Sequence, residues 1–172
     1  IYVSDSLYID DALMLKNVPK IQSMDEYKKG FLTVQDESSM IASSVLNPLC
    51  GSFVVDACSG PGGKTTHLAQ LMNNEGRILA LDVHEHRLAL VDSACRRLGV
   101  TIVETRHQDA RELQDKLEEK ADFILVDVPC SGLGVIRRRP ELRWRVECAD
   151  LSQHAAQQLE ILGQVSKCLK TG

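Results

Sequence analysis

The stretch that decides the fold lies at residues 53–65 and reads FVVDACSGPGGKT. Its short apolar run, rich in β-branched residues, is typical of a buried strand, and a helical pattern from about residue 64 to 73 follows the glycine-rich turn. Glycines at a helix start let a ligand approach the backbone, where exposed N–H groups favour an anionic group. This stretch therefore predicts a strand, a ligand-binding turn and a helix.

The same alternation of strand and helix continues on both sides of this stretch. Short apolar strands that alternate with amphipathic helices predict an α/β fold with a mostly parallel sheet covered on both faces. In such sheets, ligands bind beyond the carboxyl ends of the strands. We expect further strands at 77–81, 101–105 and 123–126, helices at 37–47, 88–98, 110–119 and 151–169, and a polar loop at 128–146. Residues 1–35 are expected to form a small N-terminal extension of short strands or turns, and residues 36–172 the ligand-binding domain.

Two classes of ligand fit the turn at residues 58–64. Its Gly-Lys-Thr ending is similar to that of a phosphate-binding P-loop, but the P-loop spacing requires glycine where this chain has Cys58. A nucleoside cofactor instead predicts an acidic residue about 20 positions after the turn. Asp82 stands 19 residues after Gly63, and Asp109 and Asp127 follow the next two strands. The carboxylates favour the nucleoside cofactor, and a P-loop nucleotide hydrolase stays as the alternative function. The carboxylates themselves have another explanation, since they could cap helices.

A proline and a cysteine follow the strand at 123–126, in the order Asp127-Val128-Pro129-Cys130-Ser131-Gly132. A cysteine just past a buried strand, approached through a rigid proline, is placed for the mouth of an active site. A buried structural thiol is the alternative. The neighbouring residues 136–145 carry five arginines, one glutamate and the single tryptophan. That composition suits phosphate contacts and base stacking, and a solvated face or an acidic protein partner is the alternative.

Composition excludes several classes of protein. The 172 residues are 44% hydrophobic and 26% charged with a net charge of −4, which excludes a disordered chain and a uniformly basic one. No apolar run approaches the roughly 18 residues of a membrane span, and no export signal is visible. The cysteines form no C-x-x-C pair, which favours free thiols in the cytoplasm. His84 and His86 have no second ligand cluster, so no metal is expected.

Four segments together resemble the Sun/Fmu (RsmB-type) bacterial 16S ribosomal RNA cytosine-C5 methyltransferases, which use S-adenosyl-L-methionine. They are residues 34–39 (VQDESS), 56–65 (DACSGPGGKT), 127–132 (DVPCSG) and 134–140 (GVIRRRP) running on to Trp144. Gly60 and Val128 are mild departures, since alanine is commoner at both positions in the family. The Gly-Val-Ile-Arg-Arg stretch favours the ribosomal RNA branch over the transfer RNA branch, which stays as an alternative together with a non-catalytic RNA-binding module.

The resemblance implies a Rossmann-like methyltransferase fold and a role for each motif. Asp82 would bind the ribose, Asp109 would lie by the adenine, and Asp127 would lie near the methionine end and the target base. Cys130 would assist product release. The implied cofactor-binding residues are Cys58, Ser59, Gly60, Pro61, Gly62, Gly63, Lys64, Asp82, Asp109 and Asp127, and the candidate RNA-binding residues are Arg137, Arg138, Arg139, Arg143, Trp144 and Arg145.

The family's attacking cysteine lies in a Thr-Cys-Ser motif, which we expect beyond Gly172. The chain opens on Ile1 rather than Met, and we expect it to be a piece of the catalytic domain that binds cofactor but methylates RNA weakly or not at all. The fourth strand, as a sheet edge, is expected to expose apolar surface.

Overall fold

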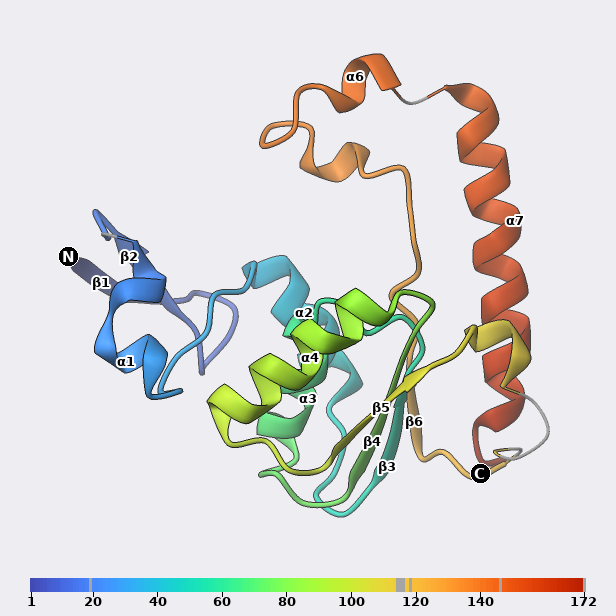
Figure 1. Ribbon diagram of the computed structural model, residues 1–172, viewed down its shortest axis with the longest axis horizontal. Coiled ribbons are helices and arrows are strands. Elements are labelled where there is room, and N and C mark those ends of the chain that lie inside the picture. The colour runs from blue at the N-terminus through green and yellow to red at the C-terminus, as the bar shows by residue number, and fades with distance from the viewer. Residues whose placement is uncertain (19, 114–116, 118, 146, 172) are drawn as a thin grey trace.

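Four parallel strands form the centre of the computed structural model, which describes residues 1–171 except 19, 114–116, 118 and 146. The strands lie in the order β5-β4-β3-β6 (Figure 1). All three pairings are parallel, so the carboxyl ends of the strands lie at one edge of the sheet. The predicted α/β architecture is confirmed. The strands are β3 (Phe53–Asp56), β4 (Arg77–Asp82), β5 (Val103–His107) and β6 (Phe123–Leu125).

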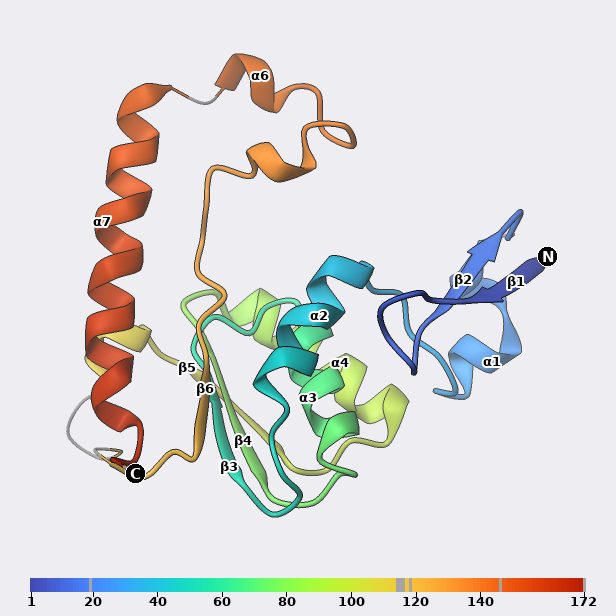
Figure 2. The same cartoon turned by 180° about the vertical axis from the view of Figure 1, so that it is seen from behind.

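Alternate side chains of the strands pack into two hydrophobic cores. Val54 faces the cluster that contains Leu68 of α3, whereas Val55 faces the cluster that contains Ile161 and Val165 of α7. Both valines are fully buried, as the period-two geometry of a strand covered on both faces requires. Figures 1 and 2 show that helices cover both faces of the sheet. The first face carries α2 (Glu37–Leu46), α3 (Gly63–Leu71) and α4 (Glu85–Leu98), and the second carries α7 (Cys148–Val165).

The N-terminal residues form a small unit docked beside α4 (Figure 1). One guanidinium nitrogen of Arg97, in the last turn of α4, donates to the carbonyl oxygens of Tyr27 at 2.9 Å and Leu32 at 2.8 Å. Its guanidinium carbon also lies 3.8 Å from the centroid of the Tyr27 ring. These contacts attach the extension to the sheet domain, and the predicted boundary at residue 35 remains a prediction. The unit contains β1 (Tyr2–Asp5), antiparallel to β2 (Leu13–Lys16), then η1 (Ile21–Ser23) and α1 (Asp25–Lys28).

Several element boundaries differ from the prediction, and at two of them tertiary hydrogen bonds intervene. The third strand was predicted at 101–105, but β5 begins at Val103, since the side-chain oxygen of Asn74 accepts a hydrogen bond from the Thr101 backbone at 2.9 Å. The last helix was predicted to reach residue 169, but α7 ends at Val165 and η4 (Ser166–Cys168) follows. The carbonyl oxygen of Cys168 there accepts the N–H of Ala121 at 2.8 Å, which draws the chain out of helical geometry.

The segments predicted at 110–119 and 128–146 are only partly regular. The first contains η2 (Ala110–Glu112), and residues 114–116 and 118 lie outside the described residues. The second contains η3 (Leu133–Val135) and α6 (Leu142–Arg145). We refer to residues 128–145 as the excursion, because Figure 2 shows this segment leaving the sheet after β6 and returning as α7.

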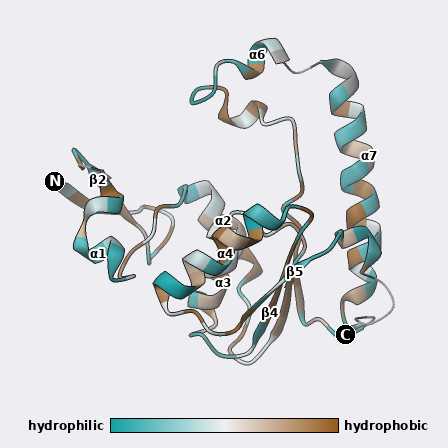
Figure 3. Ribbon diagram, viewed as in Figure 1, coloured by the Kyte–Doolittle hydropathy of each residue, from teal (hydrophilic) through white to brown (hydrophobic). Residues whose placement is uncertain are grey.

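Strand β6 is an edge strand, as predicted, but it does not expose the expected apolar surface. Phe123 and Ile124 are half-buried and Leu125 is buried. The reason is tertiary: Leu46 of α2 packs in the same cluster as Phe123 and Leu125, and Ile124 packs against the opposite core. Figure 3 shows α7 alternating between hydrophilic and hydrophobic residues, as a helix packed on one side of a sheet requires. Among the helices of the described residues, none has both the length and the apolar character needed to cross a bilayer.

Candidate active site

The glycine-rich turn between β3 and α3 packs its backbone against the next strand–helix unit. The backbone N–H and the hydroxyl of Ser59 both donate to the carbonyl oxygen of Leu81, at 2.7 and 3.0 Å. Gly62 adopts φ +105°, and a Cβ there would lie 3.0 Å from the Cα of Val91 in α4. The left-handed backbone and the close approach of α4 thus both require glycine at this position.

Asp82, at the end of β4, presents a buried carboxylate to this turn. Its Oδ2 accepts the N–H of Gly60 at 3.1 Å, its Oδ1 accepts the N–H of His84 at 2.8 Å, and the Arg87 guanidinium lies 4.0 Å from Oδ2. A Cβ at Gly60 would lie 2.6 Å from Oδ2 and 2.5 Å from the Cβ of Arg87, so the close approach depends on glycine. The two backbone donors fix the carboxylate and leave acceptor capacity for a ligand.

Asp109 follows β5 and is held by Arg111. Its Oδ1 accepts the Arg111 backbone N–H at 2.9 Å, which caps η2, and its Oδ2 lies 2.6 Å from a terminal guanidinium nitrogen of Arg111. The hydrogen bonds from Arg111 lower the pKa of Asp109, so this carboxyl is ionised at neutral pH. Asp109 thus serves as a helix cap, the alternative explanation from the sequence, and also lines the pocket described below.

Asp127, after β6, forms an ion pair with Lys64 of the turn. The Nζ of Lys64 lies 2.6 Å from Oδ2 of Asp127. The lysine of a P-loop has to reach the phosphates of a nucleotide. Here its ammonium group is engaged by a carboxylate, which together with Cys58 disfavours the P-loop alternative.

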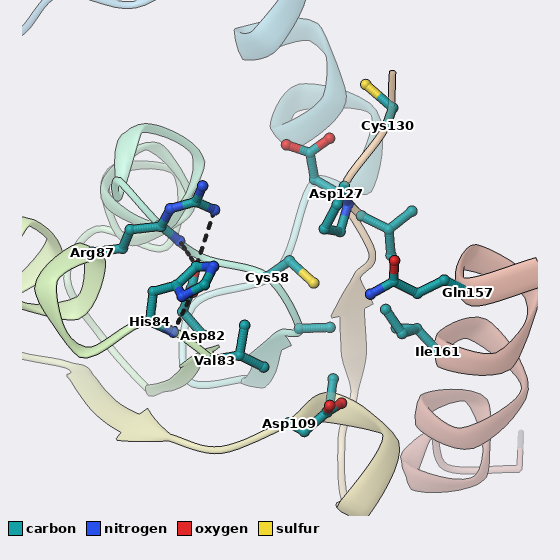
Figure 4. A pocket seen from close by; sticks show the side chains of 15 residues that line it. Cys58, Asp82, Val83, His84, Arg87, Asp109, Asp127, Cys130, Gln157 and Ile161 are labelled. Carbon is teal, nitrogen blue, oxygen red and sulfur yellow. Dashed lines mark hydrogen bonds and ion pairs between the residues drawn. The ribbon is translucent and has the colours of Figure 1, made fainter. Parts of the chain in front are cut away.

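The thiol of Cys58 lies half-buried among the strand-end carboxylates (Figure 4). Burial, followed by the negative charges of Asp56, Asp82, Asp127 and Asp109, raises the pKa of Cys58 to about 12. This thiol therefore stays protonated and is no nucleophile. The same negative charges favour a positively charged ligand and oppose a triphosphate.

Asp82, Asp109, Asp127 and Cys58 line one pocket of about 360 Å³ (Figure 4). Of the predicted site residues, the pocket is lined by Cys58, Gly60, Asp82, Asp109, Asp127 and Cys130. The remaining predicted cofactor residues shape the turn without lining the pocket; they are Ser59, Pro61, Gly62, Gly63 and Lys64.

The pocket is completed by residues that the sequence interpretation missed. Val83 and His84 follow Asp82 directly and Arg87 lies in the first turn of α4, so the rule that ligands lie past strand ends could have found them. Gln157 and Ile161 come from α7, one helical turn apart. Their spacing shows only that they share a helix face, and the sequence does not show that this face meets the pocket.

The excursion begins at the rim of the pocket and lies at the surface. Cys130 is exposed and lines the pocket, and the carbonyl oxygen of the preceding Pro129 accepts Nε2 of Gln158 at 2.8 Å. Among the predicted RNA-binding residues, Arg138 is paired with Asp36, at 2.7 and 2.5 Å from its two carboxylate oxygens. The others whose side chains the structure describes are exposed, namely Arg137, Arg139, Arg143 and Trp144; the Arg145 side chain lies outside the described residues.

The two histidines considered as metal ligands lie with ring centroids 5.5 Å apart. Within the part of the chain that the structure describes, no group of three or more potential ligand side chains is gathered. The role of His84 that the structure does show is to donate its backbone N–H to Asp82.

The fold is the Rossmann-like fold of the methyltransferases that use S-adenosyl-L-methionine. Residues 43–172 match the family model "16S rRNA methyltransferase RsmB/F", and the chain belongs to this family. The predicted family is thereby confirmed. This chain is 42% identical over 147 residues to the probable ribosomal RNA small subunit methyltransferase B of Bacillus subtilis, a match that covers 85% of this chain and 33% of that protein.

Two solved structures from Pyrococcus horikoshii are also similar to this chain. NSun6, solved with SFG, an analogue of S-adenosyl-L-methionine, is 35% identical with a TM-score of 0.82 over 90% of this chain and 39% of its own. A methyltransferase homolog protein is 34% identical with a TM-score of 0.80 over 93% of this chain and 49% of its own. The chain thus spans between a third and a half of the length of these relatives. The findings support S-adenosyl-L-methionine as the cofactor of the fold, as the sequence predicted.

Proposed function

We propose that this domain binds S-adenosyl-L-methionine in the strand-end pocket and serves the methylation of cytosine C5 in 16S ribosomal RNA. The observation that carries the proposal is the grouping of Asp82, Asp109 and Asp127 around one pocket whose rim also holds Cys130. Each carboxylate ends or follows a different strand, and the pocket brings them together with a thiol that a base could reach.

The charges of the pocket fit this cofactor. A sulfonium centre is positive. The carboxylates, which together with the larger effect of burial raise the pKa of Cys58 to about 12, create a negative field where such a centre would sit. We assign Asp82 to the ribose hydroxyls, because its oxygens are buried and fixed by the N–H groups of Gly60 and His84. Asp109 is assigned to the adenine and Asp127 to the methionine end.

The chemistry requires a thiol near the base. Cytosine C5 is a poor nucleophile, and addition of a cysteine thiolate to C6 makes C5 reactive toward the methyl group that the cofactor supplies when bound. A proton acceptor then removes the C5 proton, and the C6–S bond breaks as the C5–C6 double bond of cytosine re-forms. Cys130 lies exposed at the pocket rim, near Asp127. We assign Cys130 to product release, the role that the family resemblance implies, rather than to the attack on C6.

The excursion supports RNA as the substrate. Arg137, Arg139 and Arg143 are exposed on the excursion, which leaves the sheet at the pocket rim, and the exposed Trp144 side chain is available for stacking on a base. The similar proteins are named as small subunit ribosomal RNA methyltransferases, which favours 16S RNA over transfer RNA. A base within structured RNA would have to leave its stack to reach the pocket.

Calorimetric titration of the chain with S-adenosylhomocysteine and with ATP plus magnesium tests the cofactor assignment. We expect binding of the first and none of the second. Asp82→Asn is expected to weaken S-adenosylhomocysteine binding by about 10- to 100-fold, because hydrogen bonds to a charged group are lost. Asp25→Asn, on the exposed α1, is the matched control. Binding of ATP, or an unaffected Asp82→Asn, would refute the assignment.

Methyl transfer to unmodified 16S RNA and to transfer RNA tests the substrate and the role of Cys130. In the methylation-competent protein, Cys130→Ser is expected to accumulate a covalent RNA–protein adduct, since attack on C6 proceeds while release is blocked. Cys50→Ser, at another exposed cysteine, is the control. Loss of methylation without an adduct would make Cys130 the attacking thiol, and preference for transfer RNA would overturn the 16S assignment.

A further inference from the structure

Arg111 does not line the pocket, yet it holds two of the pocket walls. Its side chain lies between η2, which follows β5, and the helix α7 on the same face of the sheet. One arm engages Asp109 and the other reaches Glu160 at 3.1 Å. Glu160 precedes Ile161, which lines the pocket together with Asp109. Arg111 therefore ties a ligand-facing carboxylate to the helix that closes the other side of the pocket.

The hydrogen bonds from Arg111 use most of the acceptor capacity of Asp109. Its backbone N–H donates to Oδ1 at 2.9 Å, its Nε is shared between Oδ1 at 3.0 Å and Oδ2 at 3.1 Å, and a terminal nitrogen donates to Oδ2 at 2.6 Å. Three N–H groups thus meet a carboxylate that offers about four acceptor sites. About one site remains for a ligand, on a side chain that is 21% exposed and lines the pocket.

The carboxylate of Asp109 can distinguish hydrogen-bond donors from acceptors on a ligand. It is ionised, because the hydrogen bonds from Arg111 lower the pKa of Asp109, so it has no proton to give. A bidentate guanidinium also prevents it from rotating to suit another ligand. The remaining acceptor site accepts an N–H group and repels a carbonyl oxygen placed at the same position.

We propose that Arg111 is a positioning residue that makes the pocket selective for a 6-aminopurine over a 6-oxopurine by fixing the carboxylate of Asp109. This inference rests on the proposed function, since it takes the purine of the cofactor to lie beside Asp109. The link to Glu160 is assigned to holding α7 and not to the choice of purine.

The test compares two ligands that differ only at the purine, S-adenosylhomocysteine and S-inosylhomocysteine, by calorimetry on the whole chain. The unchanged chain is expected to prefer the adenosyl ligand by about tenfold or more, the scale of one charge-assisted hydrogen bond. In Arg111→Ala the preference is expected to fall below about threefold. Arg111→Lys keeps the positive charge but not the bidentate guanidinium, and its preference is expected to lie between those of Arg111→Ala and the unchanged chain. Glu160→Gln is expected to leave the preference unchanged.

The outcomes separate the two proposals. An unchanged preference in Arg111→Ala, even with weaker binding of both ligands, would show a merely structural role and overturn this inference, as would an unchanged chain without preference. Failure of the unchanged chain to bind either ligand would instead refute the proposed function. Should Arg111→Ala not fold, by circular dichroism and thermal unfolding, Arg111→Lys carries the test, and a preference equal to that of the unchanged chain overturns the inference.

Discussion

The residues of β3 and β4 and those of the excursion are stabilised in different ways. Val54, Val55 and Leu79 are fully buried, and their neighbours are apolar side chains of helices on both faces of the sheet. Between residues 128 and 144, by contrast, no side chain is buried, and Trp144 is 84% exposed. The contacts that tie the excursion to the rest of the chain include polar ones, the ion pair of Arg138 with Asp36 and the hydrogen bond to Pro129.

This difference matches the tasks that we assign to the two regions. A cofactor pocket needs carboxylates held in fixed positions, and burial of the strands that carry them provides this. A surface for a large polyanion instead needs exposed cations that can exchange their partners. The comparison predicts that substitutions in the sheet act on the free energy of unfolding, whereas those in the excursion act on local opening.

Truncation in the sheet should have the largest effect. Leu79 is fully buried in the core that faces α7. Leu79→Ala is expected to lower the free energy of unfolding by about 2–5 kcal/mol, because it removes buried methyl groups and leaves a cavity. Urea denaturation followed by circular dichroism measures this. A loss below about 1 kcal/mol would mean that the sheet is packed no better than the excursion.

The buried Asp56 should make stability depend on pH. Burial raises its pKa to about 6, even though the hydroxyl of Thr65 donates to Oδ2 at 2.7 Å. Between the ordinary carboxyl pKa of about 3.9 and 6, the folded chain holds a proton that the unfolded chain releases, so the free energy of unfolding falls as pH rises through this window and levels off above it. Asp56→Asn should therefore gain stability relative to the unchanged chain between pH 4 and pH 7, by on the order of 2–3 kcal/mol.

Thermal unfolding of both proteins from pH 4 to pH 7 checks this expectation. Asp36→Asn is the control of opposite sign, because hydrogen bonding to Arg138 lowers the pKa of Asp36. The ion pair of Asp36 contributes a small amount of stability above the ordinary carboxyl pKa and loses it as pH falls through the lowered pKa. The unfolding temperature of Asp36→Asn should therefore fall slightly below that of the unchanged chain as pH rises. If the unfolding temperatures of the unchanged chain and Asp56→Asn changed equally with pH, this result would contradict a raised pKa of Asp56.

The ion pair between Asp36 and Arg138 should act mainly on the excursion. Exposed pairs contribute about 0–1 kcal/mol, so Asp36→Asn is expected to speed tryptic cleavage within the excursion by about two- to fivefold. Global stability at pH 7 should change little. Asp25→Asn breaks another exposed pair, with Lys28, and should leave the cleavage rate as it was. Equal rates in both variants would show that the pair does not hold the excursion.

Loss of the tryptophan should have the smallest effect on stability. Trp144→Ala is expected to change the free energy of unfolding by less than about 0.5 kcal/mol, since so exposed a side chain loses little contact. Denaturation under the conditions used for Leu79→Ala gives the comparison. A loss above 1 kcal/mol would show that the excursion packs in solution as the sheet does.

The sequence was most informative where one residue type satisfies a local requirement. Gly62 is needed by its left-handed backbone angle, and Asp82 ends a strand where a parallel sheet collects ligand-binding groups. Neither requirement depends on how the helices are rotated about the sheet. The sequence therefore determined the α/β class, the glycine-rich turn and the carboxylates at the strand ends.

The tertiary structure decided which distant residues meet at these strand ends. Arg111 reaches Glu160 across 49 positions, and Arg138 reaches Asp36 across 102. Gln157 and Ile161 enter the pocket because α7 packs on the sheet in one particular rotation. Periodicity shows that a helix has an apolar face, but the packing of side chains from separate elements sets which strand end that face covers. The carboxylates were thus readable from the chain, and the side chains that position and enclose them only from the fold.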